Sequence, residues 1–126
     1  MVRKKVLVVE DDQFLAKALR LKFGAEGYDV AVAENGSQAM DLLSGDPPQA
    51  VLLDLMLPGV SGFDVLAAIR ANERWRETPV VIMSNLGQSQ EIDRGMALGA
   101  TDYIIKANVR LHDVVGLVSS YSQSES

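Results

Sequence analysis

Residues 6–12 read Val-Leu-Val-Val-Glu-Asp-Asp, an apolar run that stops abruptly at three acids. Four consecutive apolar residues, of which three are β-branched, are typical of a short strand buried on both faces. The run is too short for the hydrophobic part of an export signal, which needs about 7–15 apolar residues. The stretch therefore predicts an interior strand whose carboxyl end carries negative charge.

The same pattern recurs along the chain, and each apolar run is followed by a segment with helical spacing. Strands are predicted over residues 6–9, 28–33, 50–53, 80–83 and 103–105, and helices over 13–23, 36–43, 62–70, 88–98 and 111–121, the last with Arg110 at its cap position. Apolar strands that alternate with amphipathic helices indicate a parallel sheet with helices on both faces. Since crossover connections are right-handed, we expect an α/β fold with a doubly wound, five-stranded sheet.

The composition limits the chemistry that this chain can carry. Its 126 residues suit one domain, which we place at 1–121 with a polar tail over 122–126. The absence of cysteine excludes a disulfide framework, a thiolate zinc site and a cysteine nucleophile. A catalytic triad or a histidine-rich metal site would have to be built around His112, the only histidine. Any metal is therefore expected to be bound by oxygen, which suits Mg²⁺.

Charge and hydropathy limit the partners. There are 17 acidic and 12 basic residues, for a net charge of -5, which argues against nucleic acid as the main ligand. No stretch approaches the roughly 20 apolar residues of a membrane span. We therefore expect no membrane association and a cytoplasmic location.

Polar side chains stand at the ends of four of the predicted strands. Glu10 and Asp11 follow the first strand, Asp54 the third, Ser84 the fourth and Lys106 the fifth. Because a parallel sheet brings the carboxyl ends of its strands to one edge, we expect these groups to converge there. Three neighbouring carboxylates repel one another, so either a divalent cation or the lysine must offset their charge.

This set of groups suits phosphoryl chemistry. Carboxylate oxygens, backbone carbonyls and waters are the ligands that Mg²⁺ prefers. A carboxylate beside Mg²⁺ and a lysine is a suitable nucleophile for a phosphoryl group, because both cations offset charge on the phosphate oxygens. The hydroxyl of Ser84 could donate a hydrogen bond to the same phosphate.

Four motifs, in this order, resemble the receiver domain of two-component response regulators, the CheY-like superfamily. They are residues 7–12 (LVVEDD), 53–62 (LDLMLPGVSG), 81–84 (VIMS) and 102–106 (DYIIK). The resemblance covers nearly the whole chain and implies a flavodoxin-like fold with the sheet order 2-1-3-4-5. It also implies a signalling module that is not an enzyme, although it assists its own phosphorylation and dephosphorylation.

The resemblance implies a role for each residue at a strand end. Asp54 would accept a phosphoryl group from the phosphohistidine of a sensor histidine kinase or a phosphotransfer protein. Lys106 would bond to the phosphoryl oxygens. The ligands of Mg²⁺ would be Glu10, Asp11, Asp54 and the backbone carbonyl of Met56.

The same resemblance implies a switch. Ser84 and the backbone amide of Asn85 would bind the phosphoryl group, and Tyr103 would rotate inward into the space that Ser84 vacates. The movement would alter the face made by the fourth helix, the fifth strand and the fifth helix. A downstream partner or an output domain would bind this face, and two copies could pair through it. Output would therefore be through protein contacts, without direct binding to nucleic acid.

Three departures from the family pattern are expected to modify this behaviour. Ala107 stands where proline usually follows the lysine, so we expect a trans peptide bond or a different loop there, with an effect on kinase recognition. Asn85 is larger than the usual residue and would narrow access to Asp54. Met56 and Leu86, at positions that tune dephosphorylation, are apolar and cannot orient a water. They predict a comparatively long-lived phosphoryl group.

Other functions of a similar layout fit the residues less well. A phosphatase that uses an aspartyl-phosphate would need a second acid two residues after Asp54, where Met56 stands. A binding module that has abandoned phosphorylation usually lacks the acceptor or one of the paired acids, and all are present here. A flavin-binding domain would need a phosphate-binding loop in place of residues 10–12. The chain is either a single-domain regulator or the receiver of a longer one.

Several residues also have a plain structural interpretation. Asp12 would cap the first helix, and Ser61 the third. Tyr103 would be a half-buried packing residue. The stem of Arg70 is expected on the inner face of the third helix. The charged ends of Arg70, Arg74 and Arg76 are expected on a solvated face, with an acidic partner as the alternative. Trp75 is expected to be a loop aromatic that covers a helix end, and His112 a surface helix residue.

Overall fold

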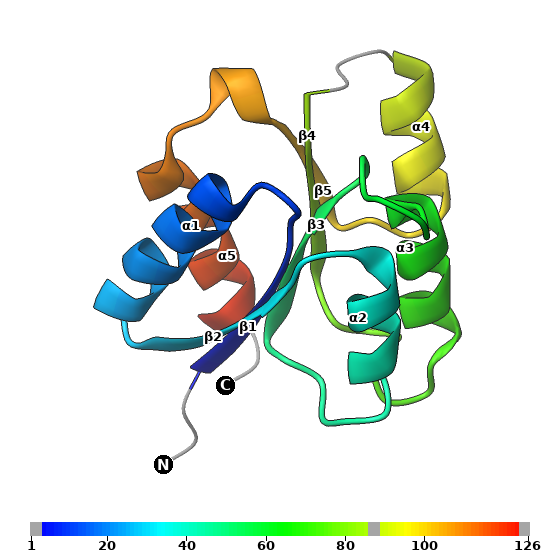
Figure 1. Cartoon of the computed structure of the whole chain (residues 1–126), viewed down its shortest axis with the longest axis horizontal. Coiled ribbons are helices and arrows are strands. Elements are labelled where there is room, and N and C mark those ends of the chain that lie inside the picture. Colours follow the sequence, from blue (N-terminus) through cyan, green and yellow to red (C-terminus); the bar gives the residue numbers. More distant parts are fainter. Residues whose placement is uncertain (1–3, 86–88, 124–126) are drawn as a thin grey trace.

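The computed structural model describes residues 4–85 and 89–123, which form five strands, five α-helices and one 3-10 helix (Figure 1). The strands are β1 (Lys4–Val9), β2 (Tyr28–Ala33), β3 (Ala50–Asp54), β4 (Val80–Ser84) and β5 (Asp102–Ile105). The α-helices are α1 (Gln13–Ala25), α2 (Gly36–Leu42), α3 (Gly62–Ala71), α4 (Ser89–Ala97) and α5 (Leu111–Gln123), and the 3-10 helix is η1 (Lys106–Asn108).

The five strands form one parallel sheet in the order β2-β1-β3-β4-β5. The predicted doubly wound fold and its strand order are therefore confirmed. Val9 of β1 lies opposite Leu53 of β3. The next residues along the two strands, Glu10 and Asp54, consequently lie side by side at the carboxyl edge of the sheet.

Helices cover both faces of the sheet, with α1 and α5 on one side and α2, α3 and α4 on the other (Figure 1). Alternate residues of β1 feed the two apolar layers, because successive side chains of a strand point to opposite faces. Val6 and Val8 pack in the layer under α1 and α5, while Leu7 and Val9 pack in the layer under α2 and α3. All four are almost completely buried.

Capping residues fix the helices that start beside the carboxyl edge. The carboxylate of Asp12 accepts hydrogen bonds from two amides in the first turn of α1, at 2.9 and 3.2 Å. The hydroxyl of Ser61 accepts from two amides of α3 in the same way. Both caps were predicted, and both set the direction of the helix that follows a site loop.

Trp75 and the guanidinium group of Arg70 make tertiary contacts whose partners were not predicted. Trp75 is only 2% exposed, and its indole nitrogen donates a hydrogen bond to the carbonyl of Gly45 at 3.0 Å. Arg70 donates three hydrogen bonds to backbone carbonyls of neighbouring loops. These contacts come from tertiary packing, which the local sequence does not encode. Arg74 and Arg76 are exposed, as expected.

The C-terminal segments refine the predicted bounds. No described peptide bond is cis, so the link from Lys106 to Ala107 is trans, as expected, and η1 forms there. Helix α5 continues through Gln123, two residues into the predicted tail, and 124–126 lie outside the described residues. Among the described helices, none has the length and apolar character needed to cross a membrane.

Candidate functional site

Three acids meet at the carboxyl edge of the sheet. Carboxylate oxygens of Glu10, Asp11 and Asp54 all lie within 4.8 Å of one another. Glu10 and Asp54 are 3% and 5% exposed, whereas Asp11 is exposed. The predicted convergence of these acids is therefore confirmed, and it follows from the pairing of β1 with β3.

Lys106 supplies a positive charge inside this cluster. Its ammonium nitrogen lies 2.6 Å from Oε1 of Glu10 and 2.9 Å from Oδ2 of Asp54. The residue reaches the acids from the end of β5, across the neighbouring end of β4. One ammonium group balances only one of the three carboxylates, so the cluster retains negative charge that a divalent cation would offset.

The surroundings shift the pKa values of Glu10 and Lys106. Burial raises the pKa of Glu10 to about 7, an effect that the bond from Lys106 opposes and that the neighbouring Asp54 strengthens. For Lys106, burial would lower the pKa, but its bonds to Glu10 and Asp54 outweigh burial and raise it. The lysine therefore stays an ammonium ion at neutral pH, while the Glu10 carboxyl is close to its own midpoint.

Both oxygens of Asp54 are held in place. Oδ1 accepts a hydrogen bond from the backbone amide of Met56 at 3.0 Å, and Oδ2 accepts from Lys106. The side chain of Met56 is 63% exposed at the mouth of the site. A carboxylate fixed at both oxygens is pre-oriented as a ligand or as a nucleophile.

The donor set fits Mg²⁺. Carboxylate oxygens prefer a hard cation, and an exposed Asp11 leaves a side of the cluster open for the waters that Mg²⁺ usually keeps. Glu10 also has a second oxygen tied to the backbone amide of Asp12 at 3.1 Å, which limits its rotation. The backbone carbonyl of Met56 stays a predicted ligand.

Ser84 and Tyr103 lie side by side in the structure. Ser84 ends β4 and is completely buried, and its hydroxyl is hydrogen-bonded to the side chain of Tyr103. Burial raises the pKa of the Tyr103 phenol, the Ser84 hydrogen bond lowers it, and the charges of Glu91 and Asp54 raise it further. The pair lies between the acid cluster and α4, because a Cβ added at Gly95 of α4 would lie 3.6 Å from the Tyr103 ring.

Other predicted residues are less closely involved. Asn85 and Ala107 are exposed at the rim, and Leu86 lies outside the described residues. His112 is exposed on α5, as expected.

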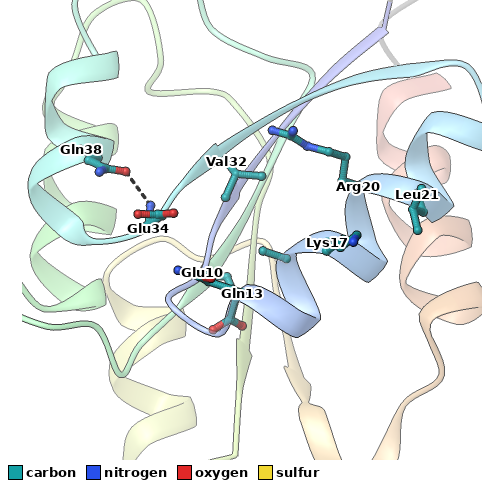
Figure 2. Close-up of a pocket in the computed structure, with 9 residues that line it drawn as sticks. Glu10, Gln13, Lys17, Arg20, Leu21, Val32, Glu34 and Gln38 are labelled. Carbon is teal, nitrogen blue, oxygen red and sulfur yellow. Dashed lines mark hydrogen bonds between the residues drawn. The ribbon is translucent and has the colours of Figure 1, made fainter.

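A cleft that the sequence did not predict flanks the acids. It has a volume of about 650 Å³, and Glu10 and Gln13 lie at its end nearest the site (Figure 2). Lys17 and Arg20 of α1 form one wall, and Glu34 lies on the opposite side. The cleft does not include Asp54, so it adjoins the site rather than containing it.

Two glycines contact the loop over residues 55–61, which follows Asp54, and these contacts were not predicted from the sequence. Gly62 begins α3 directly over the backbone of Asp54, and a Cβ there would lie 2.4 Å from the Asp54 carbonyl oxygen. Gly36 begins α2 beside Val60 of the same loop. In the sequence, each of these glycines directly follows a helix cap, which could have indicated a close contact at that position. The sequence does not show which segment makes the contact.

Fold and site together define a class: a flavodoxin-like α/β domain with paired acids, a third acid and a lysine at the carboxyl edge of its sheet. The family model for the response regulator receiver domain matches residues 6–115. The chain therefore belongs to the response regulator receiver domain family.

Curated relatives agree with this assignment. The DNA-binding response regulator MtrA of Mycolicibacterium smegmatis is 39% identical over 105 residues, which cover 83% of this chain and 45% of that protein. The uncharacterized transcriptional regulatory protein YkoG of Bacillus subtilis is 35% identical over 106 residues, covering 84% and 46%. The chain thus spans less than half the length of these relatives.

Solved structures have the same fold. The receiver domain of the Francisella response regulator 1452 superposes with a TM-score of 0.89 at 28% identity, covering 98% of this chain and 99% of that one. The signal receiver domain of a putative Luxo repressor protein from Vibrio parahaemolyticus gives 0.88 at 30% identity, covering 98% and 92%.

Proposed function

We propose that this chain is a phosphoryl-switched receiver, in which Asp54 accepts a phosphoryl group from the phosphohistidine of a sensor histidine kinase or phosphotransfer protein. One observation carries the proposal: Lys106 joins the buried carboxylates of Glu10 and Asp54, with Asp11 beside them. This arrangement provides a fixed nucleophile, a permanent cation and a second cation site in one small volume.

In the transfer step, a carboxylate oxygen of Asp54 attacks the phosphorus atom. An acyl phosphate bond forms, the phosphorus–nitrogen bond of the phosphohistidine breaks, and the electron pair leaves with the imidazole of the donor. The amide of Met56 and the ammonium group of Lys106 keep the Asp54 carboxylate oriented during the attack.

Magnesium belongs to the same proposal. Its ligands would be Glu10, Asp11, Asp54 and the backbone carbonyl of Met56, and it would neutralise charge on the phosphoryl oxygens. The Glu10 carboxyl must be ionised to bind the cation. Because its pKa is about 7, binding is expected to strengthen as the pH rises through neutrality.

The switch would use the side chains that already touch. Ser84 and the amide of Asn85 would bond to the new phosphoryl group, which draws the Ser84 hydroxyl away from Tyr103. The ring of Tyr103 lies beside Gly95 of α4, where an added Cβ would touch it, so its rearrangement would change the face made by α4, β5 and α5. We propose that a downstream partner or output domain reads this face, and that two copies can pair there.

We propose further that the chain is a signalling module rather than an enzyme, and that it acts in the cytoplasm with its kinase. We divide it into a receiver over 1–121 and a tail over 122–126. Relatives such as MtrA are named as DNA-binding regulators and are about twice as long, so an output domain in the full gene product is one source of output. The size of the full gene product on a gel separates this case from a single-domain regulator.

Incubation with acetyl phosphate and Mg²⁺, followed by intact mass measurement, tests the proposal. We expect one phosphoryl adduct, which is lost in Asp54→Asn and on chelation of Mg²⁺. Asp64→Asn is the matched control, because this exposed acid on α3 lies outside the cluster and should leave the adduct in place. A folded protein that gains no adduct, or an adduct that persists in Asp54→Asn, would overturn the proposal.

A further inference from the structure

The loop over residues 55–61 connects β3 to α3 and carries Met56, the predicted source of a backbone ligand. Its start is fixed by the bond from the Met56 amide to Asp54. Its end is fixed where the amide of Gly62 donates to the carbonyl of Leu55 at 3.3 Å. Between these two ends, the loop passes over the beginning of α2.

Gly36 is the residue of α2 that meets this loop. It is buried, and a Cβ built there would lie 2.5 Å from the carbonyl oxygen and 2.6 Å from the Cβ of Val60. Real Cβ atoms do not approach other atoms so closely, so the contact requires that position 36 has no side chain.

Backbone conformation does not explain glycine at this position. Positive φ angles occur in the described chain at Gly27, Gly59 and Gly99, and Gly36 is not among them. Alanine would favour the helix more than glycine does. The close approach of Val60 is therefore the property that distinguishes Gly36 from the ordinary first residue of a helix.

The middle of the loop also contacts the core. Val60 is half-buried against the apolar layer under α2 and α3, together with Leu57. Gly59, just before Val60, has a φ of 74°, a backbone conformation that glycine adopts more readily than other residues. Contact with Gly36 consequently constrains the loop at Val60, while the bond from its amide to Asp54 holds Met56. Together the two contacts limit how the Met56 carbonyl can turn.

We propose that Gly36 and Val60 form a seat for the loop over 55–61, and that Gly36 is a positioning residue for Mg²⁺ binding at Glu10, Asp11 and Asp54. The inference rests on the proposed function, because it assigns the seat to that same metal site. Gly36 touches neither the acids nor the metal and acts only through the loop.

Gly36→Ala tests the seat. The added methyl group must displace Val60, which moves the loop and weakens Mg²⁺ binding, measured by calorimetric titration, by about tenfold, the lower end of the effect of residues that orient metal ligands. Gly24→Ala and Gly116→Ala are matched controls, since a Cβ at either position meets no atom within 4 Å. Both controls should keep the wild-type Mg²⁺ affinity.

Thermal unfolding distinguishes positioning from a general loss of stability. A ligand raises the stability of the folded state according to its concentration relative to its dissociation constant. If Gly36 positions the metal site, the increase in Tm on adding Mg²⁺ shrinks in Gly36→Ala. A lower Tm without Mg²⁺, together with an unchanged Mg²⁺ affinity, would overturn the inference.

Changes at Val60 test the same contact from the loop side. Val60→Ala keeps the Cβ that meets Gly36, so we expect wild-type Mg²⁺ affinity. Val60→Gly removes that Cβ and should weaken binding as Gly36→Ala does. Equal affinities in the two Val60 variants would contradict the seat.

The wild-type protein separates this inference from the proposed function. If it binds Mg²⁺ and gains the phosphoryl adduct while Gly36→Ala and Val60→Gly behave identically to it, the seat alone is wrong. If the wild-type protein binds no Mg²⁺, the metal site and the seat both fail.

Discussion

At the scale of single residues, the site is defined by how Glu10, Asp54 and Lys106 share charge. The lysine bonds to both acids and keeps its proton, whereas burial leaves the carboxyl of Glu10 with a pKa near 7. A raised pKa means that the folded protein holds a proton which the unfolded chain releases near pH 4.5. The ionised form of Glu10 is thus a cost to the folded state unless a cation binds it.

A pH dependence of stability follows. In chelator, we expect the free energy of unfolding to fall as the pH rises from about 4.5 to about 7, with a contribution from Glu10 of about 3 kcal/mol at most. Denaturant unfolding of wild type and Glu10→Gln across this range measures it, because the variant lacks the titrating group. Saturating Mg²⁺ should flatten the wild-type slope. Parallel curves for the two proteins in chelator would contradict the shifted pKa.

The exposed side chain of Met56 leads to a second prediction at this scale. It lies at the mouth of the site and cannot hold a water by hydrogen bonding, which predicts slow hydrolysis of an aspartyl-phosphate. Met56→Asn should shorten the phosphoryl lifetime several-fold, measured by the decay of the adduct mass after removal of the donor. Met96→Asn, another exposed methionine, serves as control. Rapid decay in the wild type that Met56→Asn leaves unaltered would refute the prediction.

At the scale of elements, Arg70 joins segments that the sequence shows as separate. From α3 it donates to the carbonyl of Gly99 at 2.9 Å, of Arg76 at 3.0 Å and of Thr78 at 2.8 Å. It thereby ties the end of α3 to the turn after α4 and to the loop that enters β4. Burial lowers the pKa of its guanidinium group, which nevertheless remains charged.

Arg70→Met keeps the apolar stem but removes the donors. Because it leaves the carbonyls of Gly99 and Thr78, whose bonds are partly buried, without this donor, we expect a loss of about 1–3 kcal/mol in the free energy of unfolding. Arg74→Met is the matched control: Arg74 pairs with Asp46 at the surface, and such pairs contribute about 1 kcal/mol or less. Chemical denaturation measures both. Equal losses would show that Arg70 is an ordinary surface residue after all.

The elements also show where prediction from sequence succeeds. The strands and the caps Asp12 and Ser61 were predictable because hydrophobic period and capping chemistry are local. The local pattern placed Trp75 over a helix end and the stem of Arg70 on the inner face of its helix. The hydrogen-bond partners of both residues depend on which loops meet in three dimensions, so they were not predicted. Helix bounds differed by a few residues for the same reason, as at Gln123.

At the scale of the whole molecule, the parallel topology makes the site predictable. Once the five strands are known to be parallel, Glu10, Asp54 and Lys106 must lie at the same edge of the sheet. Only the distances between their side chains then require a structure. The seat at Gly36 was not predictable, because it requires knowing that the loop over 55–61 crosses α2. The topology therefore brings the acids and the lysine together, whereas the contact between Gly36 and Val60 depends on tertiary packing.

The central claim is that Asp54 carries the phosphoryl group, and chemical mapping tests it most directly. The protein is phosphorylated with acetyl phosphate and Mg²⁺, reduced with borohydride, which converts an aspartyl phosphate to homoserine, and digested for peptide mass spectrometry. The account predicts homoserine at position 54, and at no other acid of the cluster. Homoserine at another position, or unmodified Asp54 in protein that carries the adduct, would contradict it.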